Sequence, residues 1–121
     1  MIPYVKMNPC LAAYLILSAV VIQGCPTNCE CSGSFVGCSS KHLEYIPADL
    51  PDTATSVDLH DNNITAIDVG LCKRLPNLQT LTLYSNRITK IPYLFFKGCD
   101  NVQHLDLAFN ALTDVSSLMF F

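Results

Sequence analysis

The sequence predicts an α/β solenoid of about three stacked repeats, with short parallel strands on its concave face. Three asparagines, Asn62, Asn86 and Asn110, stand 24 residues apart in one hydrophobic frame. A fixed period of 20–50 residues marks a solenoid, in which each repeat buries its apolar side against its neighbours. Apolar and polar residues alternate ahead of each asparagine, the period of a half-buried strand. Function is therefore expected on a face of the stack.

Three units follow when Ala54, Leu78 and Val102 are taken as first positions: 54–77, 78–101 and an incomplete 102–121. Apolar residues then recur at the same offsets and form the predicted core. They are Val57, Leu59, Ile64, Ile67 and Leu75 in the first unit, Leu81, Leu83, Ile88, Ile91 and Cys99 in the second, and Leu105, Leu107, Leu112 and Val115 in the third.

The repeated asparagines are predicted to be structural. Each lies where the chain leaves its strand and turns inward. A side-chain amide carries two donors and an acceptor, so it can satisfy backbone groups that the turn leaves unpaired. Leaving those groups buried and unpaired would be costly. We therefore assign Asn62, Asn86 and Asn110 to the fold, as a ladder, and not to ligand binding.

The pattern L-x-x-L-x-L-x-x-N-x-L with this period resembles the extracellular leucine-rich repeat. Phe96 and Phe120 occupy the phenylalanine offset of its 24-residue form, and the resemblance implies little regular helix. Departures are few. Cys72 stands at that offset in the first unit, Cys99 replaces the last leucine of the second, and Asp68 stands where proline is usual.

Residues 1–24 read as a secretory signal peptide. Lys6 is their only charge, residues 11–22 form an apolar run of signal-core length, and Gly24 offers a small residue at the cleavage edge. The run is short for a membrane span, and no second apolar stretch of spanning length follows. We expect a secreted protein or the ectodomain of a cell-surface protein. A bacterial lipoprotein box at 22–25, with lipid on Cys25, is the alternative.

Six cysteines remain after the signal, an even number that suits a disulfide framework in an oxidising compartment. Cys25, Cys29, Cys31 and Cys38 cluster in a segment, 25–53, that resembles the N-terminal cysteine cap of secreted leucine-rich repeat proteins. The family's pairing would join Cys25 to Cys31 and Cys29 to Cys38. A zinc site is the competing interpretation.

The cap has a predicted physical role, because an uncovered solenoid end exposes apolar surface and an unpaired strand edge. Residues 35–38, after a Ser-Gly-Ser turn, are predicted to form the second arm of a hairpin that covers this edge. Cys72 and Cys99 fall at buried offsets of adjacent units. Parity favours a bridge between them, but their offsets differ by three positions, so free buried thiols remain the alternative.

Enzyme activity finds no support in the sequence, and no cofactor or metal is predicted. The chain lacks G-x-S-x-G, H-E-x-x-H and a phosphate-binding glycine loop. His42, His60 and His104 are spread over the cap and the repeats, and we expect them to be solvated surface residues. Without the signal, six basic and ten acidic side chains remain, and an acidic domain repels nucleic acid.

The outward strand positions are the predicted ligand-binding face, because solenoids use their concave sheet for extended binding. A central tyrosine is a common interface anchor, and aspartates favour a basic partner. The expected function is non-catalytic recognition of an extracellular protein. The predicted face consists of Asp58, His60, Thr80, Thr82, Tyr84, His104, Asp106 and Ala108.

The alternative is a structural matrix protein that binds collagen or glycosaminoglycan. Its support is a modest group of basic residues outside the strands, which reads as a weak docking site for sulfated sugar. The group consists of Lys73, Arg74, Arg87, Lys90 and Lys97.

Two further expectations concern glycosylation and the end of the chain. Asn63-Ile64-Thr65 is an N-glycosylation sequon, and a glycan on Asn63 is expected beside the strand face. The sequence stops inside its third unit. We expect the N-terminal part of a larger receptor or adhesion protein; a short isoform, or self-association through the last repeat, is the alternative.

Overall fold

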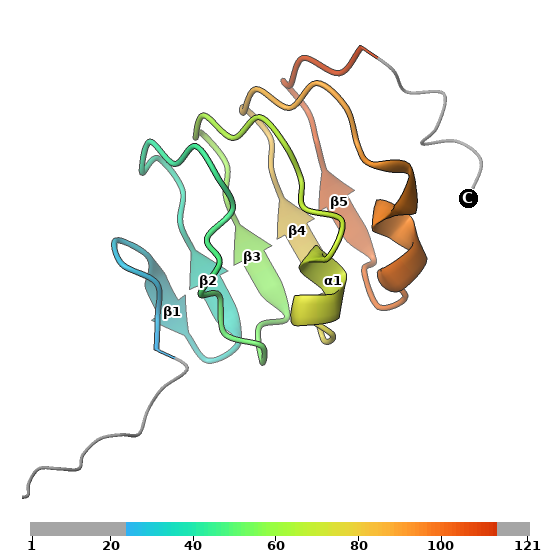
Figure 1. Ribbon diagram of the computed structural model, residues 1–121. Helices are drawn as coiled ribbons and strands as arrows, with labels where there is room; N and C mark the ends of the chain where they lie inside the picture. The colour runs from blue at the N-terminus through green and yellow to red at the C-terminus, as the bar shows by residue number, and fades with distance from the viewer. Residues whose placement is uncertain (1–23, 114–121) are drawn as a thin grey trace, which may run out of the picture.

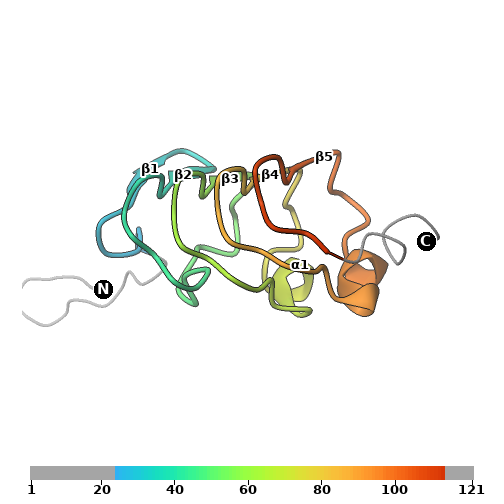
Figure 2. The same cartoon turned by 90° about the horizontal axis from the view of Figure 1, so that it is seen from above.

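The computed structural model describes residues 24–113; residues 1–23 of the predicted signal peptide, Val115 and Phe120 lie outside them. The described chain forms a five-stranded sheet in the order β1-β2-β3-β4-β5. Short helical segments lie on the opposite side of the solenoid (Figures 1 and 2). The strands are β1 (Glu30–Ser32), β2 (Phe35–Gly37), β3 (Ser56–Asp58), β4 (Thr80–Thr82) and β5 (His104–Asp106). The helical segments are α1 (Leu71–Arg74) and a 3-10 helix, η2 (Tyr93–Gly98).

The cap continues the sheet of the repeats. β1 pairs antiparallel with β2, and β2 pairs parallel with β3. Gly33 closes the hairpin with φ 59°, a left-handed conformation that glycine adopts without steric cost. The hairpin therefore covers the first edge of the repeat sheet, as the sequence predicted.

The 24-residue period appears directly in the strand register. Val57 pairs with Leu81, and Leu81 pairs with Leu105, while Val36 of the cap begins the same inward column. The neighbouring outward row runs from Asp58 through Thr82 to Asp106. One side of every strand thus enters the core and the other faces outward.

The predicted core positions are buried, and their burial decreases from the first unit to the third. All five predicted core positions of the first unit and four of the second are buried. In the third unit Leu105, Leu107 and Leu112 are only partly buried. An inner repeat is covered by a neighbouring unit on each side. The described chain has no unit after the one that contains β5, so that unit is covered on one side only.

The phenylalanine offset of the second unit packs against the core. Phe96 is partly buried there, and Phe95 before it is completely buried, with 5.1 Å between the two ring centroids in an edge-to-face arrangement. Leu71 and Cys72, 24 residues before these two, are both buried. The sequence did not single out Phe95 as a core residue.

The predicted asparagines form a ladder of hydrogen bonds between units. Asn86 Nδ2 donates to the carbonyl of Leu59 in the preceding unit (2.9 Å) and to that of Leu83 in its own (3.0 Å). Its Oδ1 accepts from the backbone N–H of Ile64 (3.0 Å). Asn62 links the first unit to the cap in the same way, through the carbonyl of Cys38. Asn110 repeats the pattern with Leu83 and Ile88.

A left-handed residue precedes every ladder asparagine. Asp61, Ser85 and Phe109 have φ of 56°, 59° and 58°. This conformation reverses the chain direction and carries the next side chain into the core. Aspartate tolerates it, but a phenylalanine there is uncommon, and the left-handed region costs roughly 1–2 kcal/mol. The sequence pattern did not reveal this strain.

Residues 24–113 contain three disulfides. Cys25 bonds to Cys31 and Cys29 to Cys38, the pairing that the resemblance implied. These bonds leave no thiol for a zinc site or for lipid on Cys25. Cys72 also bonds to Cys99. The difference of three positions between their offsets is bridged because Cys72 lies in α1 and Cys99 directly follows η2, which packs against α1.

The ladder predicts a large cost for removing one asparagine. Asn86→Ala should lower the free energy of unfolding by about 2–4 kcal/mol, because buried backbone groups of two units lose their partners. Urea denaturation monitored by circular dichroism measures the change. The exposed Asn77 makes no such bonds, so Asn77→Ala should change stability by less than about 0.5 kcal/mol. Equal midpoints for the two variants would refute the structural role.

The positive φ of Phe109 predicts that a substitution at this position can stabilise the protein. Phe109→Asn should raise the free energy of unfolding by about 0.5–1 kcal/mol, because asparagine adopts positive φ more readily than phenylalanine. The matched control is Tyr93→Asn, at another exposed aromatic outside the positive-φ positions. A stabilisation of both variants, or of neither, in the same denaturation assay would argue against backbone strain at Phe109.

Candidate functional site

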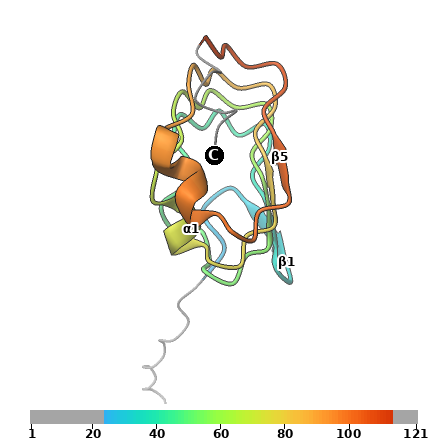
Figure 3. The same ribbon diagram turned by 90° about the vertical axis from the view of Figure 1, so that its right-hand side faces the viewer.

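The predicted face lies on the outer side of the sheet, away from α1 and η2 (Figure 3). Strand register places its positions in rows, with Ser56, Thr80 and His104 in one row. We call this surface the sheet face. It comprises the eight predicted residues together with Asp61 and Phe109, which follow β3 and β5. The prediction that these residues bind a ligand remains untested.

A stacked pair of rings lies at the centre of the sheet face. The imidazole of His60 is nearly parallel to the ring of Tyr84, with 4.6 Å between centroids and 8° between planes. His60 and Tyr84 occupy the same offset in adjacent units. Parallel strands lie roughly 4.8 Å apart, so equal offsets bring two flat side chains to stacking distance. The sequence identified both residues but not their contact.

The stack is held by a carboxylate. His60 Nδ1 lies 2.6 Å from Oδ1 of Asp58, which also accepts a hydrogen bond from the His60 backbone N–H at 3.1 Å. His60 Nε2 lies 3.7 Å from Oδ2 of Asp61. Asp58 thus orients the imidazole through Nδ1, and this orientation fixes the plane on which Tyr84 stacks.

The charge of the sheet face is negative. Asp58, Asp61 and Asp106 belong to it, and no Lys or Arg is among its defined residues. Asp106 Oδ1 accepts from the backbone N–H of Ala108 at 3.0 Å, the same local bond that Asp58 makes. Phe109 adds an apolar side chain that is 84% exposed, so an exposed aromatic lies beside an acidic surface.

The basic residues do not form one patch. Arg74 contacts Asp68 at 3.3 Å and the carbonyl of Ala48 at 3.2 Å, so much of its guanidinium is engaged. Lys73 on α1 and Lys97 on η2 occupy the same offset on the helical side. The other two, Arg87 and Lys90, lie on the segment that follows β4.

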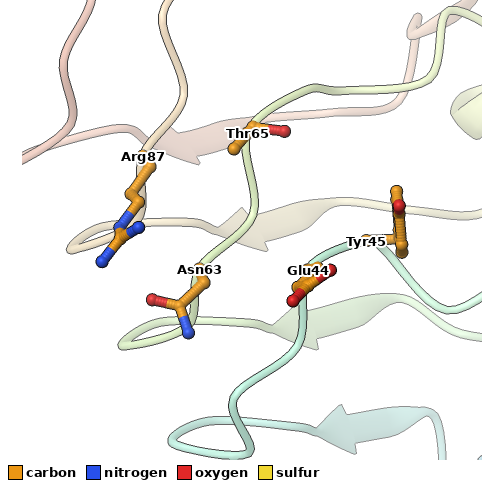
Figure 4. A pocket seen from close by; sticks show the side chains of 5 residues that line it. All are labelled: Glu44, Tyr45, Asn63, Thr65 and Arg87. Carbon is orange, nitrogen blue, oxygen red and sulfur yellow. The ribbon is translucent and has the colours of Figure 1, made fainter.

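A shallow depression of about 230 Å³ lies on the flank where the chain returns from the turns. It is lined by Glu44, Tyr45, Asn63, Thr65 and Arg87 (Figure 4). These side chains come from the segments after β2, β3 and β4, and we call their surface the return flank. Asn63 therefore lies on the return flank and not on the sheet face itself.

A second depression of about 310 Å³ shares Tyr45 and continues to Asp68 and Arg74. Both depressions are open. Within residues 24–113 no group of three or more His, Cys, Asp or Glu side chains is arranged to hold a metal ion. In the same range no helix has the length and apolarity needed to span a bilayer.

The disulfide hairpin, the parallel strands and the asparagine ladder together define a cysteine-capped repeat solenoid. The family model described as "Leucine rich repeat N-terminal domain" matches residues 24–51, and that described as "Leucine rich repeat" matches residues 52–112. The chain belongs to the leucine-rich repeat family. Its three disulfides indicate an oxidising, extracellular environment.

Similar proteins share this module within longer chains. Mouse (Mus musculus) vasorin is 35% identical over 78 residues, which cover 64% of this chain and 12% of vasorin. Dog (Canis lupus familiaris) decorin is 46% identical over 59 residues, covering 49% of this chain and 16% of decorin. Zebrafish (Danio rerio) leucine-rich repeat-containing protein 3 is 40% identical over 83 residues, covering 61% and 31%.

A solved structure supports the same architecture. Human 5T4, also called trophoblast glycoprotein, superposes with a TM-score of 0.67 at 30% identity, over 74% of this chain and 33% of that one. The chain thus spans a third or less of the length of each of these four relatives.

Proposed function

We propose that this module recognises an extracellular protein through its sheet face, without catalysis, and that the His60–Tyr84 stack is the central anchor. The observation that carries the proposal is the locked stack. Two flat side chains from adjacent repeats lie 4.6 Å apart, and Asp58 orients one of them at 2.6 Å.

A fixed aromatic pair suits an interface anchor. Side chains that are immobilised before binding lose less conformational entropy when a partner arrives. Tyrosine adds a large apolar surface and a hydroxyl that can form hydrogen bonds, and it is enriched among residues that dominate binding energy. Both Tyr84 and His60 are partly exposed, so a partner can still cover them.

The charge of the face selects the partner's chemistry. Asp58 and Asp61 lie beside His60, and Asp106 lies in the same outward row as Asp58. These three carboxylates favour a partner segment that carries Lys or Arg. Complementary charge accelerates association and discriminates against acidic partners. Binding should therefore weaken as salt concentration rises, since surface charges are screened over roughly 8–10 Å.

A catalytic use of the His60–Asp58 pair is less well supported. A general base would present Nε2 to a nucleophile, but here Nε2 faces Asp61 at 3.7 Å, and Tyr84 covers one side of the ring. In the described chain no serine or cysteine side chain is hydrogen-bonded to His60. The pair is better suited to orienting the stack.

The test uses a displayed random-peptide library selected on the secreted, disulfide-bonded chain. Enriched peptides should carry Lys or Arg, and Tyr84→Ala should weaken their binding about 10- to 100-fold, the loss of a hot-spot side chain. Biolayer interferometry of the purified variant measures the change.

The control is Tyr93→Ala, which removes an exposed tyrosine from η2 on the opposite side of the solenoid. It should leave binding unchanged. Peptides that lack basic residues, or that bind Tyr84→Ala as tightly as the wild type, would contradict the proposed face.

A second candidate function is binding of sulfated glycosaminoglycan on the helical side. The specific observation is that Lys73 and Lys97 recur at the same offset of stacked units, at the ends of α1 and η2. Cations repeated along a solenoid match the repeated sulfates of a polysaccharide. The sheet face, being acidic, would take no part.

Heparin chromatography tests this second candidate. If it is correct, the chain should be retained at about 0.15 M salt, and the double variant Lys73→Ala/Lys97→Ala should elute earlier, because surface charge interactions are screened by salt. Arg87→Ala/Lys90→Ala, with the same loss of charge at another site, should elute like the wild type. Flow-through of the wild-type chain would exclude the candidate.

A further inference from the structure

We propose that Asn63 carries an N-linked glycan and that its first sugar ring occupies the depression on the return flank, with Tyr45 as its apolar wall. This inference does not depend on the proposed binding function. Two independent observations, a glycosylation sequon and a surface depression, coincide at this position. Asn63-Ile64-Thr65 is the only N-x-Ser/Thr sequence in the 121 residues, and its asparagine and threonine both line the depression.

The local backbone presents the sequon on one side. Ile64 is completely buried, while Asn63 is partly exposed and Thr65 is exposed. Residues 63 and 65 thus lie on either side of a buried residue, and both line the depression. The Asn63 backbone N–H donates to the carbonyl of Leu43 at 2.8 Å, which fixes the segment. Among the described residues, no hydrogen bond engages the Asn63 side-chain amide.

The attachment chemistry uses this free amide. The donor is an oligosaccharide linked to a lipid pyrophosphate, supplied by the secretory pathway. Asn63 Nδ2 forms a bond to C1 of the first sugar while the bond from C1 to the pyrophosphate oxygen breaks. One amide proton is released and the lipid pyrophosphate leaves. No oxidant or reductant takes part.

The side chains that line the depression can bind a sugar ring through both apolar and polar contacts. Tyr45 is 76% exposed, and its ring offers an apolar surface to the C–H face of a pyranose. Glu44 supplies an acceptor and Arg87 supplies donors for hydroxyl and acetamido groups. Neither charge is paired within the described residues. The volume of about 230 Å³ lies below the ~300–1,000 Å³ of pockets that enclose drug-sized ligands, and it suits one ring.

The glycan would therefore cover the return flank and leave the sheet face open. This arrangement differs from a glycan that merely projects into solvent, because a seated ring links the cap, through Glu44 and Tyr45, to the first and second units, through Thr65 and Arg87. A seated first sugar should stabilise the junction between cap and repeats.

Attachment is tested on the complete chain secreted from cultured mammalian cells. Intact mass should fall after treatment with peptide N-glycosidase in the wild type. The variants Asn63→Gln and Thr65→Ala should show no fall, whereas the conservative Thr65→Ser should keep it. An unchanged wild-type mass overturns the proposal.

Binding of the first sugar in the depression is tested by trimming the glycan to its first N-acetylglucosamine with an endoglycosidase. The trimmed Thr65→Ser protein should melt about 2–4 °C higher than Thr65→Ala. Adding Tyr45→Ala should abolish this difference, whereas adding Tyr93→Ala, the matched exposed tyrosine on η2, should preserve it. If the difference in melting temperature persists in the Tyr45→Ala background, the glycan is attached but its first sugar does not bind against Tyr45. That result would overturn this part of the proposal.

Discussion

Every repeat depends on one amide side chain that joins the backbones of two units. Asn86 donates to carbonyls on both sides of the junction between the first and second units and accepts an N–H from the first. The turn after each strand must bury these backbone groups, because the following isoleucine or leucine enters the core. Without the amide they would be unpaired in an apolar interior. The ladder therefore makes the tight turn compatible with the stack.

The same constraint separates the two surfaces that we propose for protein binding and for glycan attachment. Because each turn is pinned at its asparagine, side chains before the turn stay on the sheet face and side chains after it stay on the return flank. His60 and Tyr84 stack on the first surface, and Asn63 and Thr65 line the depression on the second. A glycan on the return flank and a protein on the sheet face could then be accommodated by one small solenoid without competing for space. The left-handed residue before each asparagine marks the boundary between the surfaces.

The sequence predicted the strand positions better than the helical segments. The inward and outward rows were predictable because a strand alternates with period two and the repeat has a fixed length. Phe95, which is completely buried in η2, was not singled out because a 3-10 turn has a different period from the strand pattern that defined the core positions. The pairing of Cys72 with Cys99 stayed open for a similar reason. It depends on the packing of α1 against η2, which residue offsets do not encode.

The sequence by itself determined the family, the core positions of the first two units, the ladder and the residues available on the sheet face. These depend on a period and on residue type, which are local and repeated. Tertiary structure alone decided that His60 stacks on Tyr84 under the control of Asp58, that the basic residues separate into different sites, and that the sequon faces a depression beside Tyr45. Each of these depends on distances between side chains from different units or segments. Those distances are set by strand spacing and by the course of the return segments, and neither is written in any single repeat.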